Sequence, residues 1–146
     1  MNTPISLLLR EKVSDVYSVN SESSVLEAVH EMNRLRIGCV VVVNEQNRLV
    51  GIFTERDVLQ RVVAVRASPS ETKIVDVMST EVETVTGHTT VEEAMVAMTQ
   101  RRHRHLPVME DGDIIGLVSI GDITRWISRE NRDEADSLRE YITGVY

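Results

Sequence analysis

Two short segments of the chain place a hydroxyl three residues before a carboxylate, at points where an apolar run ends. They are Thr54 with Asp57 and Ser119 with Asp122. The first backbone amides of a helix are unpaired and partly positive, so a helix that begins there could bind a phosphate, and the hydroxyl adds a donor. The carboxylate could accept hydrogen bonds from both hydroxyls of a ribose. The same residues also suit a plain helix cap, and spacing alone favours the cap.

The first half of the chain predicts the order strand, helix, strand, strand, helix. Ser24 and Glu27 form a capping-box pattern, in which Ser accepts from a backbone amide and Glu reaches back to the cap. Apolar residues then recur at helical spacing, and a valine-rich run typical of a buried strand follows. The predicted strands cover 16–19, 39–43 and 49–53, and the next helix covers 55–65.

The second half predicts the same order. Thr90 and Glu93 repeat the capping-box pattern, and Asp111-Gly112 is a standard pair for a tight hairpin turn. The predicted strands cover 82–85, 105–109 and 114–118, and a final helix runs from near 121 to about 141.

The two halves also match residue by residue. The matched positions are 65 apart near the carboxylates and 66 apart upstream, and the difference falls in a turn, where a duplicated fold tolerates a change of length. The pairs are Gly51 with Gly116, Thr54 with Ser119, Asp57 with Asp122, Ser24 with Thr90, Glu27 with Glu93, Ala28 with Ala94 and Met32 with Met98. The sequence therefore predicts units at 11–66 and 74–128, a linker at 67–73 and a helical tail at 129–146.

This repeat resembles a tandem pair of cystathionine-β-synthase (CBS) domains, the Bateman module. The resemblance rests on Gly, two apolar residues, Thr or Ser, two more residues and Asp at 51–57 and 116–122, and on Arg-His-Leu-Pro-Val at 104–108. The Tyr-Ile-x-Gly motif at 141–144 is similar to that of small stand-alone bacterial CBS-pair proteins and their plant organellar relatives. The resemblance implies an α/β (α+β) fold, in which two pseudo-twofold-related βαββα units pack as a Bateman module.

The same resemblance implies a function. CBS pairs regulate attached or separate proteins by binding adenosine-containing ligands, namely AMP, ADP, ATP, NAD(H) or S-adenosylmethionine, and they usually form flat dimers. We therefore expect a homodimeric, regulatory sensor of adenine nucleotides that acts on an unidentified protein. We expect no catalytic residue and no catalytic cofactor.

The resemblance further implies one nucleotide site in each half. Adenine would lie against the end of each first strand, the ribose on the carboxylate, and the phosphate on the hydroxyl and nearby basic residues. The first-half site would comprise Val19, Asn20, Ile37, Thr54, Arg56 and Asp57. The second-half site would comprise Val85, Thr86, Arg104, His105, Pro107, Ser119, Gly121 and Asp122.

The two expected sites differ in charge. A cationic run at 101–105 precedes one strand of the second half, and Arg104 or His105 could meet phosphate there. Cations at this place also suit the end of the preceding helix. The equivalent first-half residues carry no charge, and the candidate phosphate contact in that half is Arg56, whose counterpart is Gly121. We expect two sites of different affinity, or one occupied and one degenerate.

Composition argues against other partners. The 146 residues carry a formal net charge of −7 and only 3% aromatic side chains, so neither a basic field nor a stacking platform for nucleic acid is available. The acidic charge also disfavours anionic membranes, and the longest apolar run, Cys39–Val43, is far too short for a span. Cys39 is the single cysteine, so we expect a reducing compartment, the cytoplasm.

Other functions stay open beside the nucleotide sensor. The chain could be a protein-interaction module with vestigial clefts, for example a regulator of a redox partner, or a binder of S-adenosylmethionine that does not depend on phosphate. A metal site at His103 and His105 lacks further ligands at a recognised zinc spacing. Ser119, His105 and Asp122 lack a nucleophile-elbow motif. We therefore expect neither a metal site nor an enzyme.

Overall fold

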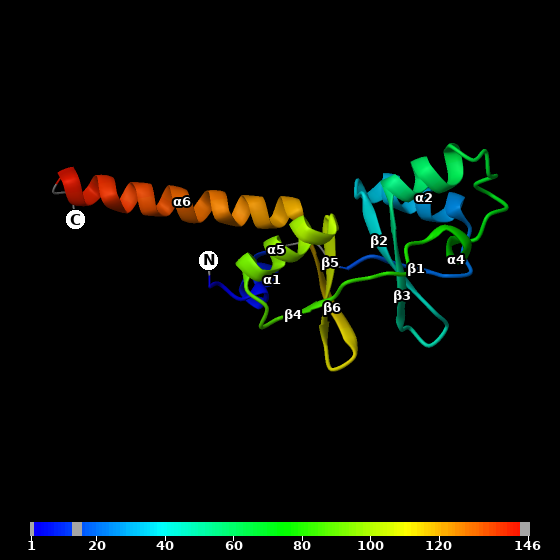
Figure 1. Ribbon diagram of the computed structural model, residues 1–146, viewed down its shortest axis with the longest axis horizontal. Coiled ribbons are helices and arrows are strands. Elements are labelled where there is room, and N and C mark those ends of the chain that lie inside the picture. The colour runs from blue at the N-terminus through cyan, green and yellow to red at the C-terminus, as the bar shows by residue number, and fades with distance from the viewer. Residues whose placement is uncertain (1, 13–15, 144–146) are drawn as a thin grey trace. The chain divides into compact units, whose positions relative to one another are not determined.

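The computed structural model describes residues 2–12 and 16–143, with side chains as far as residue 140 (Figure 1). Gly144 of the C-terminal motif lies outside the described residues. The helices and strands are α1 (Ile5–Glu11), β1 (Ser18–Asn20), α2 (Val25–Leu35), β2 (Cys39–Val43), β3 (Leu49–Thr54), α3 (Glu55–Asp57), the π-helix η1 (Val58–Val63), α4 (Ile74–Val77), β4 (Val85–Thr86), α5 (Val91–Arg101), β5 (His105–Glu110), β6 (Asp113–Ser119) and α6 (Ile120–Thr143).

In the part of the chain that the structure describes, six strands form two three-stranded sheets, ordered β1-β2-β3 and β4-β5-β6. In the first sheet β1 pairs with β2 in parallel, and β2 pairs with β3 as an antiparallel hairpin. In the second, the turn between β5 and β6 has positive φ at Asp111 and Gly112, which is the conformation that Asp-Gly favours in a tight hairpin. The expected α+β class and the expected hairpin are confirmed.

The first strand of each half is shorter than predicted and lies further along the chain. β1 begins at Ser18 and β4 at Val85, although Val16 and Val82 fit the same apolar pattern. Both valines instead pack beside the buried cluster of Cys39, Val41 and Ile52. An apolar pattern indicates that residues are buried, but a buried residue need not lie in a paired strand.

The caps of α2 and α5 form where they were predicted. The hydroxyl of Ser24 accepts the Glu27 amide at 3.1 Å, and that of Thr90 accepts the Glu93 amide at 3.1 Å. The helix predicted over 55–65 begins as α3 and continues as the wider η1, and α6 confirms the predicted final helix.

The chain divides into two compact units, each built from segments that are distant in sequence. The first-half unit comprises Ser14–Thr84 and Pro107–Leu117, and the second-half unit comprises Met1–Val13, Val85–Leu106 and Val118–Tyr146. The first-half unit packs α2, η1 and α4 on one face of its sheet, around Phe53 and Val40. In the second-half unit Ile5, Val91, Leu106 and Ile123 are fully buried.

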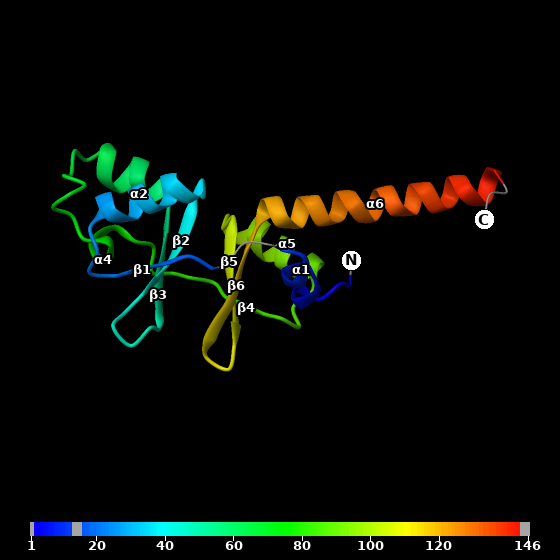
Figure 2. The same ribbon diagram turned by 180° about the vertical axis from the view of Figure 1, so that it is seen from behind.

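Two segments that the sequence analysis did not predict as elements, residues 3–12 and 72–79, carry α1 and α4 (Figures 1 and 2). They dock in the same way. Ile5 donates its amide to Thr89 O at 2.8 Å, and Ile74 donates to Ser23 O at 2.9 Å. In the opposite direction, Val91 at the start of α5 donates its amide to Thr3 O at 2.8 Å, and Val25 at the start of α2 donates its amide to Thr72 O at 2.9 Å. We call residues 3–12 and 72–79 the leading segments.

Candidate functional site

In the first half, Thr54 and Asp57 form a complete capping box at the start of α3. Thr54 donates its amide to Asp57 Oδ2 at 3.0 Å, and Asp57 donates its amide to Thr54 Oγ1 at 3.3 Å. The second oxygen, Asp57 Oδ1, accepts the Ser79 hydroxyl at 3.1 Å. The buried Asp57 carboxylate therefore serves the fold as a cap and holds one leading segment.

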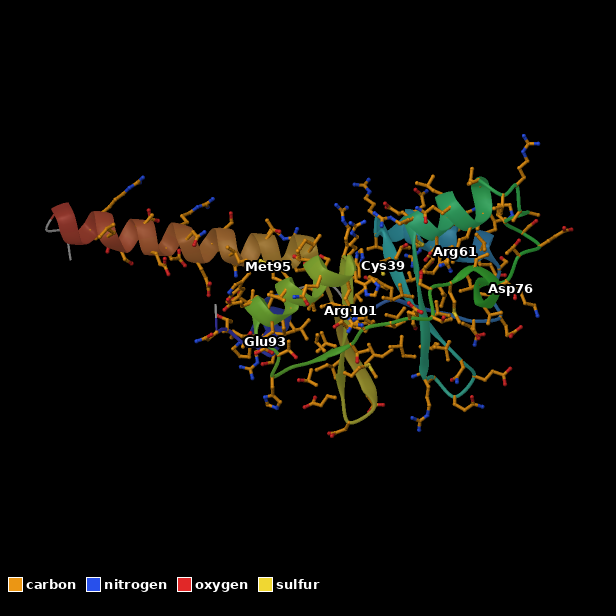
Figure 3. All side chains as sticks on the ribbon, in the orientation of Figure 1. Cys39, Arg61, Asp76, Glu93, Met95 and Arg101 are labelled. Atoms are coloured by element: carbon orange, nitrogen blue, oxygen red, sulfur yellow. The ribbon has the colours of Figure 1, made fainter. Side chains whose placement is uncertain are left out.

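Arg61, on η1, is the cation of this first-half site (Figure 3). Its Nε lies 3.7 Å from Asp57 Oδ1. Its Nη1 also donates to the carbonyls of Val77 at 3.2 Å and Met78 at 2.8 Å, at the end of α4. Part of its hydrogen-bonding capacity is therefore used by the fold.

In the second half, Ser119 and Asp122 repeat the reciprocal bonds at the start of α6. Ser119 donates its amide to Asp122 Oδ2 at 2.9 Å, and Asp122 donates its amide to Ser119 Oγ at 3.1 Å. Here two cations form ion pairs with the Asp122 carboxylate: Lys12 Nζ lies 2.8 Å from Oδ2, and Arg125 Nη2 lies 2.6 Å from Oδ1. The side chain of Asp122 is 7% exposed and that of Lys12 is 24% exposed, so this ion pair is partly shielded from water, whereas the Arg125 side chain is 73% exposed.

Ser79 and Lys12 therefore meet the two carboxylates from corresponding leading segments. One brings a neutral hydroxyl and the other an ammonium group. Sequence analysis missed both residues, because they lie 22 and 110 positions from the aspartates that they contact. The segments share little more than Thr-x-Ile, at Thr3 and Thr72, which is too short a signal to align them.

The Asp122 carboxyl is held in its charged form. Burial raises its pKa, but hydrogen bonds from Lys12 and Ser119 and the charge of Lys12 more than offset this effect. The pKa of Asp122 therefore lies below its usual value, and the group is an anion at neutral pH.

The first residues of α3 and α6 are also hydrogen-bonded to the residue before the central strand of their sheet. Glu55 donates its amide to Gly38 O at 3.0 Å, and Ile120 donates to Arg104 O at 2.8 Å. A Cβ at Gly38 would lie 2.9 Å from a carboxylate oxygen of Glu55, so an acidic side chain covers this place in the first half. In the second half the exposed Arg104 stands there instead. The two places differ in the sign of their local charge.

Asn20 and Thr86, expected near the base, lie exposed at equivalent places, as the last residues of β1 and β4. Their side-chain oxygens accept the amides of Glu22 at 2.9 Å and His88 at 3.3 Å, so both have a structural role.

The other predicted residues differ in exposure. Val19, Ile37, Val85 and His105 are half-buried, Arg56 is exposed, and Pro107 is buried within the first-half unit. Gly121 leaves space near Arg125, whose Nη1 would lie 3.3 Å from an added Cβ. The structure thus brings together Ser119, Gly121 and Asp122 with the Arg104 carbonyl, at the first turn of α6.

Among residues 2–12 and 16–143, no three His, Cys, Asp or Glu side chains gather in a way that suits a metal ion. No helix in these same ranges is long and apolar enough to cross a membrane.

The sequence matches the family model for the CBS domain twice, at residues 11–64 and 74–129. It is 42% identical over 130 residues to the CBS domain-containing protein CBSX3, mitochondrial, of Arabidopsis thaliana, covering 86% of this chain and 63% of that protein. It is 31% identical over 110 residues to the CBS domain-containing protein YhcV of Bacillus subtilis, covering 75% of this chain and 77% of that one. The chain thus spans less than two thirds of the Arabidopsis protein.

Solved structures are also similar. The CBS-domain containing protein ATU1752 from Agrobacterium tumefaciens superposes with a TM-score of 0.79 at 34% identity, covering 86% of this chain and 93% of that one. The CBS domain protein PAE2072 from Pyrobaculum aerophilum, complexed with AMP, gives a TM-score of 0.74 at 26% identity, covering 82% and 88%. From its repeated motif, its two similar sheets and these matches, the chain belongs to the CBS domain family and carries two CBS domains in tandem.

Proposed function

We propose that this CBS pair is a regulatory module that binds an adenine nucleotide (AMP, ADP, ATP or NAD(H)) and acts on a separate protein. CBS-pair proteins are commonly regulatory, and the Pyrobaculum relative is complexed with AMP. The observation that carries the proposal is the cluster at the start of α6, where the Ser119 hydroxyl and the ionised Asp122 carboxylate lie within one turn, beside the cations of Lys12 and Arg125. These groups are complementary to the phosphate and the ribose of a nucleoside phosphate.

Each group has a role in this proposal. The Ser119 hydroxyl binds phosphate at the first turn of α6, because a long helix concentrates partial positive charge there. Gly121 leaves room for the phosphate oxygens. Asp122 accepts the ribose hydroxyls. The adenine contacts expected of Val85, Thr86, His105 and Pro107 stay predictions.

We propose the second-half site as the stronger of the two. Lys12, Arg104 and Arg125 surround or adjoin its helix start, whereas Glu55 covers the equivalent place in the first half. The cations of the second half attract an anionic ligand, whereas Glu55 in the first half repels it. In the first-half site, proposed to comprise Val19, Asn20, Ile37, Thr54, Arg56 and Asp57, we expect weak binding or none.

We further propose that the chain works as a homodimer in a reducing compartment such as the cytoplasm. Cys39 is the single cysteine of the sequence and is buried, which fits such a compartment. The outer part of α6, residues 131–140, is exposed throughout and offers a surface to a second copy or to the regulated protein. A ligand can transmit a signal only if it binds two arrangements of the module with different affinity.

One observation favours the alternative, an interaction module whose sites no longer bind nucleotide. Both aspartates already accept hydrogen bonds from their own helix and from a leading segment, as structural caps do. In this alternative a partner, for example a redox protein, would bind regardless of nucleotide. A binder of S-adenosylmethionine would instead show no dependence on phosphate.

Calorimetric and thermal-shift titrations of the nucleotide-stripped protein distinguish these functions. The ligands are AMP, ADP, ATP, NAD, NADH, adenosine and S-adenosylmethionine, and the variants are Asp122→Asn and the matched Asp57→Asn. Ligand at 100 times its dissociation constant adds about 2.7 kcal/mol to the stability of the folded state. We expect phosphorylated adenosines to stabilise the wild type and Asp57→Asn but not Asp122→Asn. If no ligand stabilises folded wild-type protein, the sensor function is wrong.

A further inference from the structure

The Asp122 carboxylate already accepts more hydrogen bonds than it could keep while it binds a ribose. Its Oδ2 accepts both Lys12 Nζ at 2.8 Å and the Ser119 amide at 2.9 Å, and its Oδ1 accepts Arg125 at 2.6 Å. A carboxylate oxygen has about two acceptor positions, so Oδ2 is filled. A ribose whose two hydroxyls engage both oxygens must displace a donor from Oδ2.

Lys12 is the donor that can leave Oδ2. The Ser119 amide is fixed, because it belongs to the backbone turn that begins α6 and forms half of the reciprocal cap. Lys12 approaches on a flexible four-carbon side chain. Arg125 contacts the other oxygen, and its side chain is 73% exposed, so it can turn into water with little loss.

The departure of Lys12 has a consequence for ligand choice. Its side chain is only 24% exposed beside a carboxylate that is 7% exposed, so its ammonium group is poorly hydrated where it lies. Moving such a charge away from its partner is unfavourable unless another anion receives it. The phosphate of a nucleotide is such an anion, whereas adenosine supplies none.

From this we propose that Lys12 makes the second-half site select phosphorylated adenosines. In the free protein its ammonium group holds the Asp122 carboxylate; when a nucleotide binds, the ribose takes that carboxylate and the phosphate takes the ammonium. Adenosine has to displace Lys12 from the carboxylate, but it has no phosphate to receive the ammonium group. The inference rests on the proposed nucleotide function and adds to it a selecting residue that lies outside the repeated motif.

In the first half the cation near the carboxylate is Arg61 of η1, whose Nε lies 3.7 Å from Asp57 Oδ1. Its guanidinium also donates to the carbonyls of Val77 and Met78, and the leading segment itself brings no cation to the carboxylate. There the leading segment offers the Ser79 hydroxyl to Asp57 at 3.1 Å, and a neutral hydroxyl can rotate away from a carboxylate without needing a new anion. Phosphate selection by exchange of a cation is therefore a property of the second-half site.

The leading segment does not depend on Lys12 to stay docked. Thr3 Oγ1 donates to Glu130 Oε1 at 3.0 Å, Glu11 forms an ion pair with Arg129, and Ser6 donates its amide to Gly87 O at 3.0 Å. Replacement of Lys12 by Met keeps the length of the side chain and removes its charge. This substitution therefore tests the exchange without removing the segment.

The control is Lys73→Met, in the other leading segment. Lys73 Nζ pairs with Glu22 at 2.7 Å, with both side chains more than half exposed and without contact to either candidate aspartate. Lys12→Arg is a second variant, which keeps the charge while changing the shape of the head group. Thermal melts establish that every variant is folded before ligand is added.

The experiment measures the affinities of AMP and adenosine by calorimetry on the nucleotide-stripped full chain. We expect wild type, Lys73→Met and Lys12→Arg to prefer AMP by at least tenfold. In Lys12→Met we expect AMP to bind at least tenfold more weakly and adenosine to bind more tightly. An unchanged AMP-to-adenosine ratio in folded Lys12→Met overturns the inference but leaves the nucleotide function standing. If the wild type binds neither ligand, the proposed function and the inference both fail.

Discussion

The ammonium group of Lys12 lies 2.8 Å from the carboxylate of Asp122, joining two residues that are 110 positions apart in the sequence. This contact links the leading segment at 3–12 to the first turn of α6, where Asp122 also caps the helix. We therefore expect the charge state of this one buried carboxyl to affect the stability of the second-half unit.

The first prediction concerns acid stability. Because the pKa of Asp122 is below its usual value in the folded protein, the unfolded chain binds a proton there more readily. Its stabilisation is fully present above the unfolded pKa of about 3.9 and is lost as the pH falls through the lower, folded pKa. We expect Lys12→Met to lower the free energy of unfolding at pH 7 by about 1–2 kcal/mol.

Urea unfolding at pH values from 7 down to 2.5 measures this difference. It should shrink below pH 4 and vanish once the carboxyl is protonated in both proteins. Lys73→Met, whose ion pair lies in solvent, should unfold like the wild type throughout. A Lys12→Met difference that is the same at pH 7 and pH 2.5 would show that the contact stabilises by packing rather than by charge.

The second prediction concerns the end of α5. Arg102 follows the helix with φ of 57°, in the left-handed region that favours glycine, whereas Arg101 is the last helical residue. Arg102→Gly should therefore stabilise the protein by about 1 kcal/mol, and Arg101→Gly should destabilise it by about 1 kcal/mol. Differential scanning calorimetry should show midpoints that move in opposite directions, by roughly 2–4 °C each. Two equal decreases would contradict the left-handed assignment.

The third prediction concerns Gly51, in the middle of β3. An added Cβ would lie 2.6 Å from Met78 Sδ and 2.9 Å from the carbonyl oxygen of Ser79. That carbonyl also accepts the Ile52 amide at 2.9 Å, so it cannot move without loss of a hydrogen bond. Gly51→Ala should destabilise the protein by about 1–3 kcal/mol in urea unfolding. At Gly87 an added Cβ meets only an ordinary 3.4 Å contact, so Gly87→Ala, the control, should leave stability unchanged or slightly raised.

The fourth prediction concerns the outer turns of α6, which extend away from α1 and α5 (Figures 1 and 3). Residues 131–140 are all exposed, and among the described residues no other element lies along them in Figure 3. A chain that ends after Arg132 should therefore keep the thermal midpoint of the monomer fold. Analytical ultracentrifugation tests the proposed homodimer: if the full chain dimerises through this surface, the truncated chain should dimerise more weakly, and if the surface serves another protein, truncation should leave self-association unchanged.

Much of the fold followed from local pattern. Ser24 and Thr90 cap their helices as predicted, because a cap depends on residues three positions apart. Asp111-Gly112 forms the predicted turn, because its backbone conformation is set by the two residues themselves. The duplication was visible for the same reason: each half repeats these local signals at nearly constant spacing.

Local pattern did not determine which elements pair or dock. Val16 and Val82 were predicted to lie in strands, yet they pack outside the sheets, because strand pairing needs a neighbour that only the folded chain supplies. The leading segments were missed because α1 and α4 are short and take their stability from docking.

By itself, then, the sequence determined the repeated motif, its caps and the pair of carboxylates, all of which depend on neighbours within a few residues. Tertiary structure alone decided that Lys12 holds Asp122 while Ser79 holds Asp57, because each contact joins segments far apart in the chain. The sequence shows two matched sites; in the folded chain one leading segment brings the partly buried ammonium group of Lys12 to its carboxylate, and the other brings the neutral hydroxyl of Ser79.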